Sequence, residues 1–237
     1  MAFFIFYKMT LTRIITHLAL LVFYPIIAQS QGIEKTNFAV CSHPVTVDKV
    51  VRDSASLTLF ITLENHLSNG YFCASGNIVL QDLIFGTKAQ LIRAEGVPVC
   101  PEMYHFKWSG EKLHFSLVFQ AVDTSIHFVD LIELCDENCL VINGLFLDQS
   151  TNNLLNQGFD AYTHNNLSLA LHSFKEAIKL NPDYPYGFLY GNVIKILLDQ
   201  NNKKEAENWA WKLRTSRMKD KFSVLKQIEL EKGFSIE

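Results

Sequence analysis

A helical pattern over residues 154–182 constrains the fold of this sequence more than any other feature. Its small, aromatic and helix-ending residues are Gly158, Ala170, Phe174, Ala177 and Pro182. Small side chains allow two antiparallel helices to approach closely, and one large aromatic side chain can fill the space between them. The pair Asn165-Asn166 lies between the two halves, and asparagine tolerates the left-handed backbone of a turn. The pattern therefore predicts a helical hairpin with Phe174 buried inside it.

A weaker copy of this pattern follows 36 residues later. Asn201-Asn202 repeats Asn165-Asn166, and Ala206 repeats Ala170, at the same offset. Apolar residues line one face of each predicted helix of the copy at helical spacing. They are Tyr190, Val193, Ile194 and Leu197 in the first helix, then Ala206, Ala210 and Leu213 in the second. Two successive helical hairpins are therefore expected.

Both hairpins resemble the tetratricopeptide repeat, in which helix pairs stack side by side. The first copy departs from the family pattern at Gln157, which replaces an apolar residue. The second has Ile194 for the family glycine and Ala210 for the aromatic residue. A charged amphipathic helix over 219–232 would cover the last apolar surface, as the ends of such arrays require. The resemblance implies two repeats over residues 151–216 and a capping helix within residues 217–237.

The resemblance also implies a function, because tetratricopeptide repeats bind other polypeptides in a groove and carry no chemistry of their own. The groove positions fall on the first helix of each repeat. They are Asn152, Leu155, Phe159, Tyr162 and Thr163, then Phe188, Gly191, Lys195, Leu198 and Asp199. We expect a protein-binding surface on six of them, namely Leu155, Phe159, Tyr162, Phe188, Lys195 and Leu198. Alternatively, the side chains from the first helix pack against the preceding domain and bind nothing.

Residues 1–30 are interpreted as a signal peptide. An apolar run over residues 14–28 follows two basic residues, and its length suits a signal-peptide core but is short for a membrane span. Ala28 and Ser30 supply the small residues that signal peptidase reads. We therefore expect an exported protein, periplasmic or secreted, that touches the membrane only through this signal. An uncleaved membrane anchor is the alternative.

Residues 31–148 are predicted to form a β-sandwich domain. Leu57, Leu59, Ile61 and Leu63 alternate with other residues at the period of two that is typical of a strand. Residues 104–108 and 113–119 are predicted to pair as a hairpin, with Trp108 opposite Leu113. Further strands are expected at 45–51, 71–80, 88–94, 126–134 and 139–147. About seven or eight short strands favour an antiparallel sandwich.

The run Phe115-Ser-Leu117-Val-Phe119, followed by Asp130-Leu-Ile-Glu133, loosely resembles immunoglobulin-like domains of uncharacterised bacterial secreted proteins. This resemblance implies no activity. The predicted fold class is therefore α+β in two parts: an immunoglobulin-like antiparallel sandwich, then a short helical repeat array with a C-terminal capping helix.

The cysteines lie only within the β-rich part, at positions 41, 73, 100, 135 and 139. In an exported protein, disulfides are the first interpretation. We expect Cys135 to pair with Cys139 and Cys73 to pair with Cys100, which leaves Cys41 unpaired. A metal site built on Cys135, Cys139 and a histidine is the alternative, although no second pair with ligand spacing accompanies it.

The sequence contains no recognisable catalytic or cofactor motif, so we predict a protein that is not an enzyme and takes no cofactor. Cys41-Ser42-His43 places a thiol near an imidazole, but adjacency in sequence does not make a catalytic pair. His105 and His114 could meet on the predicted hairpin and hold a metal. Asp130 and Glu133 point to opposite faces of a regular strand and make a poor acid-base pair. The formal charge of −3 argues against a nucleic-acid partner.

We therefore predict an exported scaffold protein that binds another protein or peptide of unknown identity. Two other classes stay open. One is a sandwich that binds carbohydrate or another ligand while the helices support it. The other is an enzyme whose site in the β-rich part has no linear motif.

The mature chain is predicted to begin at or near Gln31, because cleavage after Ser30 fits the small residues before it. N-terminal sequencing of protein from the native host checks this. A membrane-retained species that still carries Met1, or Met9 as the true start, would contradict the prediction.

Overall fold

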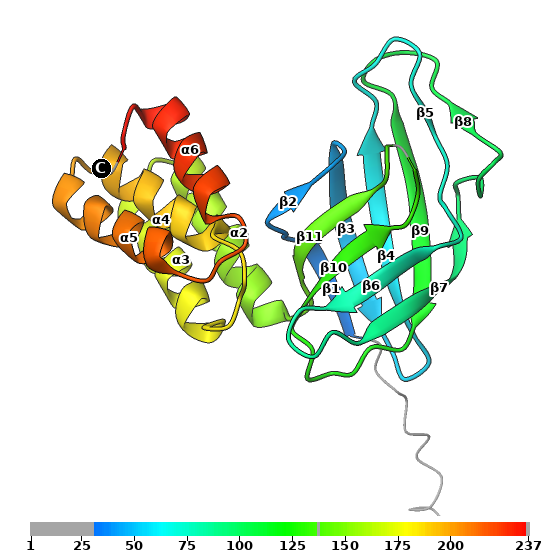
Figure 1. Ribbon diagram of the computed structural model, residues 1–237, viewed down its shortest axis with the longest axis horizontal. Coiled ribbons are helices and arrows are strands. Elements are labelled where there is room, and N and C mark those ends of the chain that lie inside the picture. Colours follow the sequence, from blue (N-terminus) through cyan, green and yellow to red (C-terminus); the bar gives the residue numbers. More distant parts are fainter. Residues whose placement is uncertain (1–30, 137, 236–237) are drawn as a thin grey trace, which may run out of the picture.

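The computed structural model describes residues 31–136 and 138–235, which form two parts (Figure 1). Residues 31–148 build a large curled antiparallel sheet, here called the β region. Residues 149–235 build five helices, here called the helical region. The predicted order of a β-rich part followed by a helical part is confirmed.

Nine strands of the β region form one sheet in the order β1-β3-β4-β9-β7-β6-β10-β11-β2. Their bounds are β1 (Gln31–Thr36), β2 (Val40–Cys41), β3 (Val45–Arg52), β4 (Ser56–Glu64), β6 (Ile78–Asp82), β7 (Lys88–Glu95), β9 (Lys112–Gln120), β10 (Phe128–Glu133) and β11 (Val141–Phe146). The two edge strands, β1 and β2, are separated by residues 37–39 alone. This short connection brings the two edges together, so the sheet must curl.

The core of the β region follows from the alternation along its central strands. In β4, the four predicted inward residues from Leu57 to Leu63 are buried. They meet buried residues of β9, where Leu59 lies opposite Leu117 and Ile61 opposite Phe115. Burial of such side chains is the main favourable contribution to folding. The period-two prediction for β4 is therefore confirmed.

The hairpin predicted between residues 104–108 and 113–119 is wrong. β8 (Tyr104–His105) pairs with β5 (Tyr71–Phe72) in a separate two-stranded sheet. Both edges of β9 are already taken, by β4 and β7. Trp108 is 58% exposed, and its carbonyl accepts a hydrogen bond from Asn65 Nδ2 (2.8 Å). The strand predicted at 71–80 is likewise divided, into β5 and β6.

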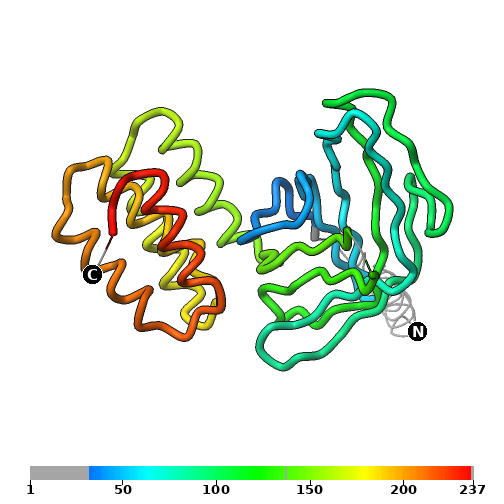
Figure 2. The backbone as a smooth tube through the Cα atoms, turned by 45° about the horizontal axis from the view of Figure 1, so that its top comes forward, coloured from blue at the N-terminus to red at the C-terminus, as the bar shows by residue number. Residues whose placement is uncertain are grey.

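The helical region contains two hairpins and a last helix. Their bounds are α2 (Gln149–Thr163), α3 (Leu167–Leu180), α4 (Phe188–Asp199), α5 (Lys203–Thr215) and α6 (Lys221–Lys232). Asn165 and Asn201 adopt the left-handed backbone at the two predicted turns. Asn166 and Asn202 then cap α3 and α5 by accepting a backbone N–H with the side chain. Figure 2 shows these helices running alongside one another on one side of the β region.

The packing of α2 against α3 depends on one small and one large residue. Phe174 is 1% exposed. A Cβ atom added to Gly158 would lie 2.9 Å from the Phe174 ring, which is closer than real Cβ contacts come. Glycine therefore allows the two helices to approach with the ring between them. The predicted burial of Phe174 is confirmed.

The helical region is fixed to the β region by the segment between α3 and α4. The Tyr184 ring stacks on Phe146, with 4.4 Å between ring centroids, and its hydroxyl donates to the Gly144 carbonyl (2.7 Å). The Tyr186 hydroxyl donates to Oδ2 of buried Asp130 (2.7 Å). Apolar stacking and satisfied polar groups thus hold the two parts in one arrangement.

The predicted signal peptide (1–30), with its cleavage position at Ala28 and Ser30, lies outside the described residues. Within residues 31–136 and 138–235, no helix combines the length and the apolar character that a membrane span needs. Gln31, the expected first residue of the mature chain, begins strand β1 and lies opposite Arg52.

Phe174→Ala is predicted to lower the free energy of unfolding by about 3–5 kcal/mol, because it leaves a cavity between α2 and α3. Phe222→Ala is the matched control: Phe222 is 68% exposed on α6, so its loss should cost less than about 0.5 kcal/mol. Denaturant titration of both variants measures the difference. Equal costs would contradict the packing described for this hairpin.

Candidate functional site

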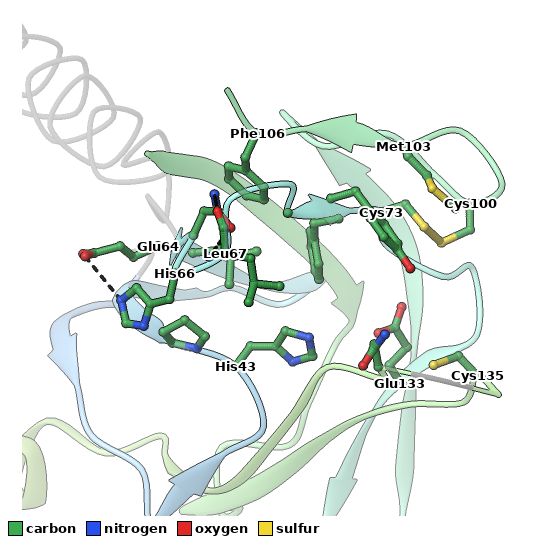
Figure 3. Close-up of a pocket in the computed structure, with 17 residues that line it drawn as sticks. His43, Glu64, His66, Leu67, Cys73, Cys100, Met103, Phe106, Glu133 and Cys135 are labelled. Carbon is green, nitrogen blue, oxygen red and sulfur yellow. Dashed lines mark hydrogen bonds and ion pairs between the residues drawn. A yellow bond between two sulfur atoms is a disulfide. The ribbon is translucent and has the colours of Figure 1, made fainter. Parts of the chain in front are cut away.

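A pocket lies in the β region, at the end away from the start of α2. Its volume is about 500 Å³. Its walls come from the ends of β4 and β10, the segment before β3, strand β5, and the residues on either side of β8 (Figure 3). Strand ends and connections often form binding sites, because a rigid sheet positions them while their side chains remain accessible.

The inner wall of this pocket is apolar. Leu63, Phe72 and Phe106 are buried residues that line it. The Phe72 ring lies 5.6 Å from the Phe115 ring below it and 6.0 Å from the His43 ring beside it, measured between centroids. Such ring packing fixes the side chains before any ligand enters.

Both predicted disulfides are present, and both border this pocket. Cys73 is bonded to Cys100, and Cys135 to Cys139. The first joins the connection after β5 to the connection before β8, and the second closes the connection between β10 and β11. Cys41 is left as a half-buried free thiol that packs against the core, as expected. Covalent links thus hold connections that contain little regular structure.

Glu133 supplies a nearly buried carboxylate to the pocket. It is 5% exposed. Oε1 accepts a hydrogen bond from the Ser75 amide (2.7 Å) and Oε2 accepts one from the Leu140 amide (2.6 Å). Both partners are neutral backbone amides, which carry no opposing charge. The negative charge therefore stays available to a ligand.

His43 lies on the same side of the pocket as Glu133 (Figure 3). Burial lowers the pKa of His43 below its ordinary value, and the negative charge of Glu133 opposes this shift only in part. His43 Nδ1 lies 2.8 Å from Ser42 Oγ, which also donates to the Cys139 carbonyl (2.8 Å). Ser42 is thus engaged with the neighbouring connection and is not one of the residues that line the pocket.

Three exposed apolar side chains line the pocket, and two more lie close to it along the chain. Leu67, Tyr71 and Met103 line it and are exposed, and Val99 and Trp108 lie exposed nearby in the chain. We call these five residues the rim. Exposed apolar residues beside a pocket are typical of binding surfaces.

The groove positions expected on α2 lie close to the β region. Leu155 is fully buried and so presents no surface to a partner. Asn152 is buried as well, and its Oδ1 accepts from the Asn37 amide (2.7 Å). Phe159 and Phe188 line a smaller pocket of about 380 Å³ together with residues 35–38 and 46–48. The first helix therefore contacts the β region through Asn152, whereas Tyr162, which the alternative interpretation also placed against that region, is 38% exposed and donates to α4.

Three of the five groove positions on α4, Gly191, Lys195 and Asp199, contact α6. A Cβ atom at Gly191 would lie 2.7 Å from Val224, so α6 lies directly against this helix. Lys195 is paired with Glu231 (2.6 Å). A hydrogen-bonded network also links α2, α4 and α6. The Tyr162 hydroxyl of α2 donates to Asp199 of α4 (2.6 Å), and Asp199 is paired with Lys232 of α6 (2.6 Å). Leu198 is half-buried against the core of the helical region.

The residues named for the alternative metal sites have other partners or positions in the described part of the chain. Because the predicted hairpin is wrong, His105 lies on β8 opposite Tyr71, whereas His114 lies on β9 and contacts Thr62. In the part of the chain that the structure describes, no cluster of three or more His, Cys, Asp or Glu residues could hold a metal ion. Asp130 contacts the helical region and Glu133 lines the pocket, so they are separated as expected.

Sequence reasoning missed this pocket, because its lining comes from segments that are far apart along the chain. The cysteines were the one signal that pointed to this end of the β region. No family model, curated protein or solved structure matches the chain.

His43 is predicted to make stability pH-dependent. Because its pKa is lowered in the folded protein, the unfolded chain binds a proton first as the pH falls below about 6.5. The free energy of unfolding should therefore decrease as the pH is lowered from 7 through that value. Denaturant titrations at several pH values, with an NMR titration of the imidazole, measure both effects. His43→Gln should weaken the dependence, whereas His127→Gln at an exposed position should not.

Proposed function

We propose that this chain is an exported, non-enzymatic binding protein that holds a polypeptide partner at the disulfide-bonded end of its β region. The observation that carries the proposal is the pocket of about 500 Å³ with Leu67, Tyr71 and Met103 exposed at its mouth. Aromatic residues and methionine are enriched at protein–protein interfaces, and a preformed pocket beside them can accept one inserted side chain.

The topology supports an immunoglobulin-like sandwich as the scaffold of this site. Strands β3-β4-β9-β7 follow one another in one half of the sheet, and β6-β10-β11 follow in the other. If these seven strands are lettered A to G in chain order, the two halves read ABED and CFG, which is the strand order of immunoglobulin-like domains. In many such domains, the connections at one end of the sandwich bind the partner.

Two features support a tetratricopeptide-like array for the helical region. The capped turns at Asn165-Asn166 and Asn201-Asn202 repeat at an offset of 36 residues. Gly158 and Phe174 also pack as the family pattern implies. In this proposal the array is a rigid support, because its groove positions already contact the β region and α6.

Export is supported by the two disulfides, which persist in oxidising compartments. It agrees with the signal peptide expected over residues 1–30.

A polypeptide fits the rim better than a carbohydrate or a reaction substrate. Three of the five rim residues, Leu67, Val99 and Met103, are aliphatic, so a sugar ring could stack only on Tyr71 and Trp108. Among the described residues that line the pocket there is no serine, threonine or free cysteine to act as a nucleophile. His43 and Glu133 are therefore more readily explained as binding groups than as members of a covalent catalytic site.

The double variant Tyr71→Ser, Met103→Ser is predicted to reduce partner capture about tenfold or more, because it removes exposed anchors at the mouth. Immobilised mature protein would be exposed to an envelope extract of the native host, and bound proteins quantified by mass spectrometry. The control Phe222→Ser, Leu230→Ser alters two apolar residues on α6 that are even more exposed than Tyr71 and Met103. If the α6 control loses capture and the Tyr71, Met103 variant retains it, the partner binds the helical region and the proposal is contradicted.

A further inference from the structure

The residues that line the pocket include two carboxylates but no lysine or arginine. Glu64 and Glu133 are the charged residues that line it, and neither lysine nor arginine joins them there. Glu64, at the exposed side, is paired with Lys112 (3.3 Å) and lies 3.4 Å from His66. Among the ion pairs formed within the described residues, none includes Glu133. The unbalanced charge of the pocket is therefore that of Glu133.

Glu133 retains capacity for a further hydrogen bond. Each of its oxygens accepts one backbone amide, and a carboxylate offers about four acceptor positions in all. Because this group is nearly buried, water and salt screen its charge less than they screen a surface carboxylate. His43 does not neutralise it at neutral pH, since burial lowers the pKa of that imidazole.

The apolar walls suit the stem of a long basic side chain. Lysine and arginine carry a charged head on several methylene groups, and they place that stem along apolar surface. Phe72 and Phe106 provide such surface inside the pocket, and Tyr71 adds an exposed ring at the mouth. Aromatic faces also attract an ammonium or guanidinium group. An apolar passage that leads to a carboxylate therefore matches a lysine or arginine in shape and in charge.

We infer that the pocket binds a basic side chain, lysine or arginine, of the polypeptide partner, and that Glu133 is the residue that pairs with its charged head. This inference rests on the proposed function, because the rim must first hold the polypeptide. It adds the chemical class of the inserted residue, which the rim alone does not specify.

Two short acetylated and amidated peptides test the inference. They share one sequence of leucine and phenylalanine around a central arginine, which is replaced by neutral citrulline in the second peptide. Both are titrated into the full mature protein and followed by NMR. The arginine peptide should bind about tenfold or more tightly, because only it forms a charge-assisted pair. The side-chain carboxyl ¹³C resonance of Glu133 should shift with the arginine peptide and stay in place with citrulline.

Variants separate Glu133 from its surroundings. Glu133→Gln should abolish the preference for arginine, whereas Glu64→Gln, which removes the other carboxylate of the pocket lining, should retain it. Glu133 also accepts the Ser75 and Leu140 amides, so Glu133→Gln could disturb the fold as well as the pocket. The dispersion of its amide NMR signals shows whether the variant is folded. If it is not, the ¹³C measurement on the wild-type protein decides the question.

The outcomes distinguish the inference from the proposed function. Equal binding of both peptides, or arginine binding that leaves the Glu133 carboxyl resonance unshifted, would overturn the inference and leave the rim as a binding surface. Absence of binding by either peptide, at concentrations up to the millimolar range, would overturn both.

Discussion

The buried carboxylate of Asp130 determines how the two regions of this protein sit together. Oδ1 accepts the Gly144 amide on the neighbouring strand β11 (2.7 Å), and Oδ2 accepts the Tyr186 hydroxyl from the helical region (2.7 Å). Lys219 lies 3.8 Å away and supplies a positive charge. A buried carboxylate is costly unless it is hydrogen-bonded or paired, so each of these partners is needed where it stands. The helical region is consequently held in place rather than loosely tethered.

This arrangement divides the β region into two ends with different roles. Near Phe146 the chain enters α2, and Tyr184 and Tyr186 cover the adjoining face. At the other end, the connections are held by Cys73–Cys100 and Cys135–Cys139 and enclose the pocket. A disulfide limits the freedom of irregular segments, which keeps a site in shape without regular hydrogen bonding. The pocket can therefore be preformed although few of its residues belong to long strands.

The elements that were predictable from sequence are those set by neighbours in the chain. The turns at Asn165 and Asn201, the close approach at Gly158 and the alternation along β4 each depend on a local backbone preference or a local period. The pairing of Trp108 with Leu113 failed for the opposite reason. Apolar residues do alternate in both segments, but β4 and β7 pair with the two edges of β9. Which strands compete for an edge cannot be inferred from either segment alone. The short strands β1 and β2, which close the curl of the sheet, carried too weak a pattern to be foreseen.

The candidate site shows the same division. The sequence by itself determined a β-rich part followed by helical hairpins and a buried Phe174, because spacing and residue type fix these within short distances along the chain. The two disulfide pairs were expected only from proximity along the chain, and it is the fold that brings Cys73 and Cys100, 27 residues apart, together. Only the tertiary structure decided that Leu155 is buried and that α6 occupies the expected groove on α4. It also decided that His43, Tyr71, Met103 and Glu133 surround one pocket. These residues meet because strand order places distant segments side by side, and strand order depends on which edges and faces remain free once the rest of the chain has packed.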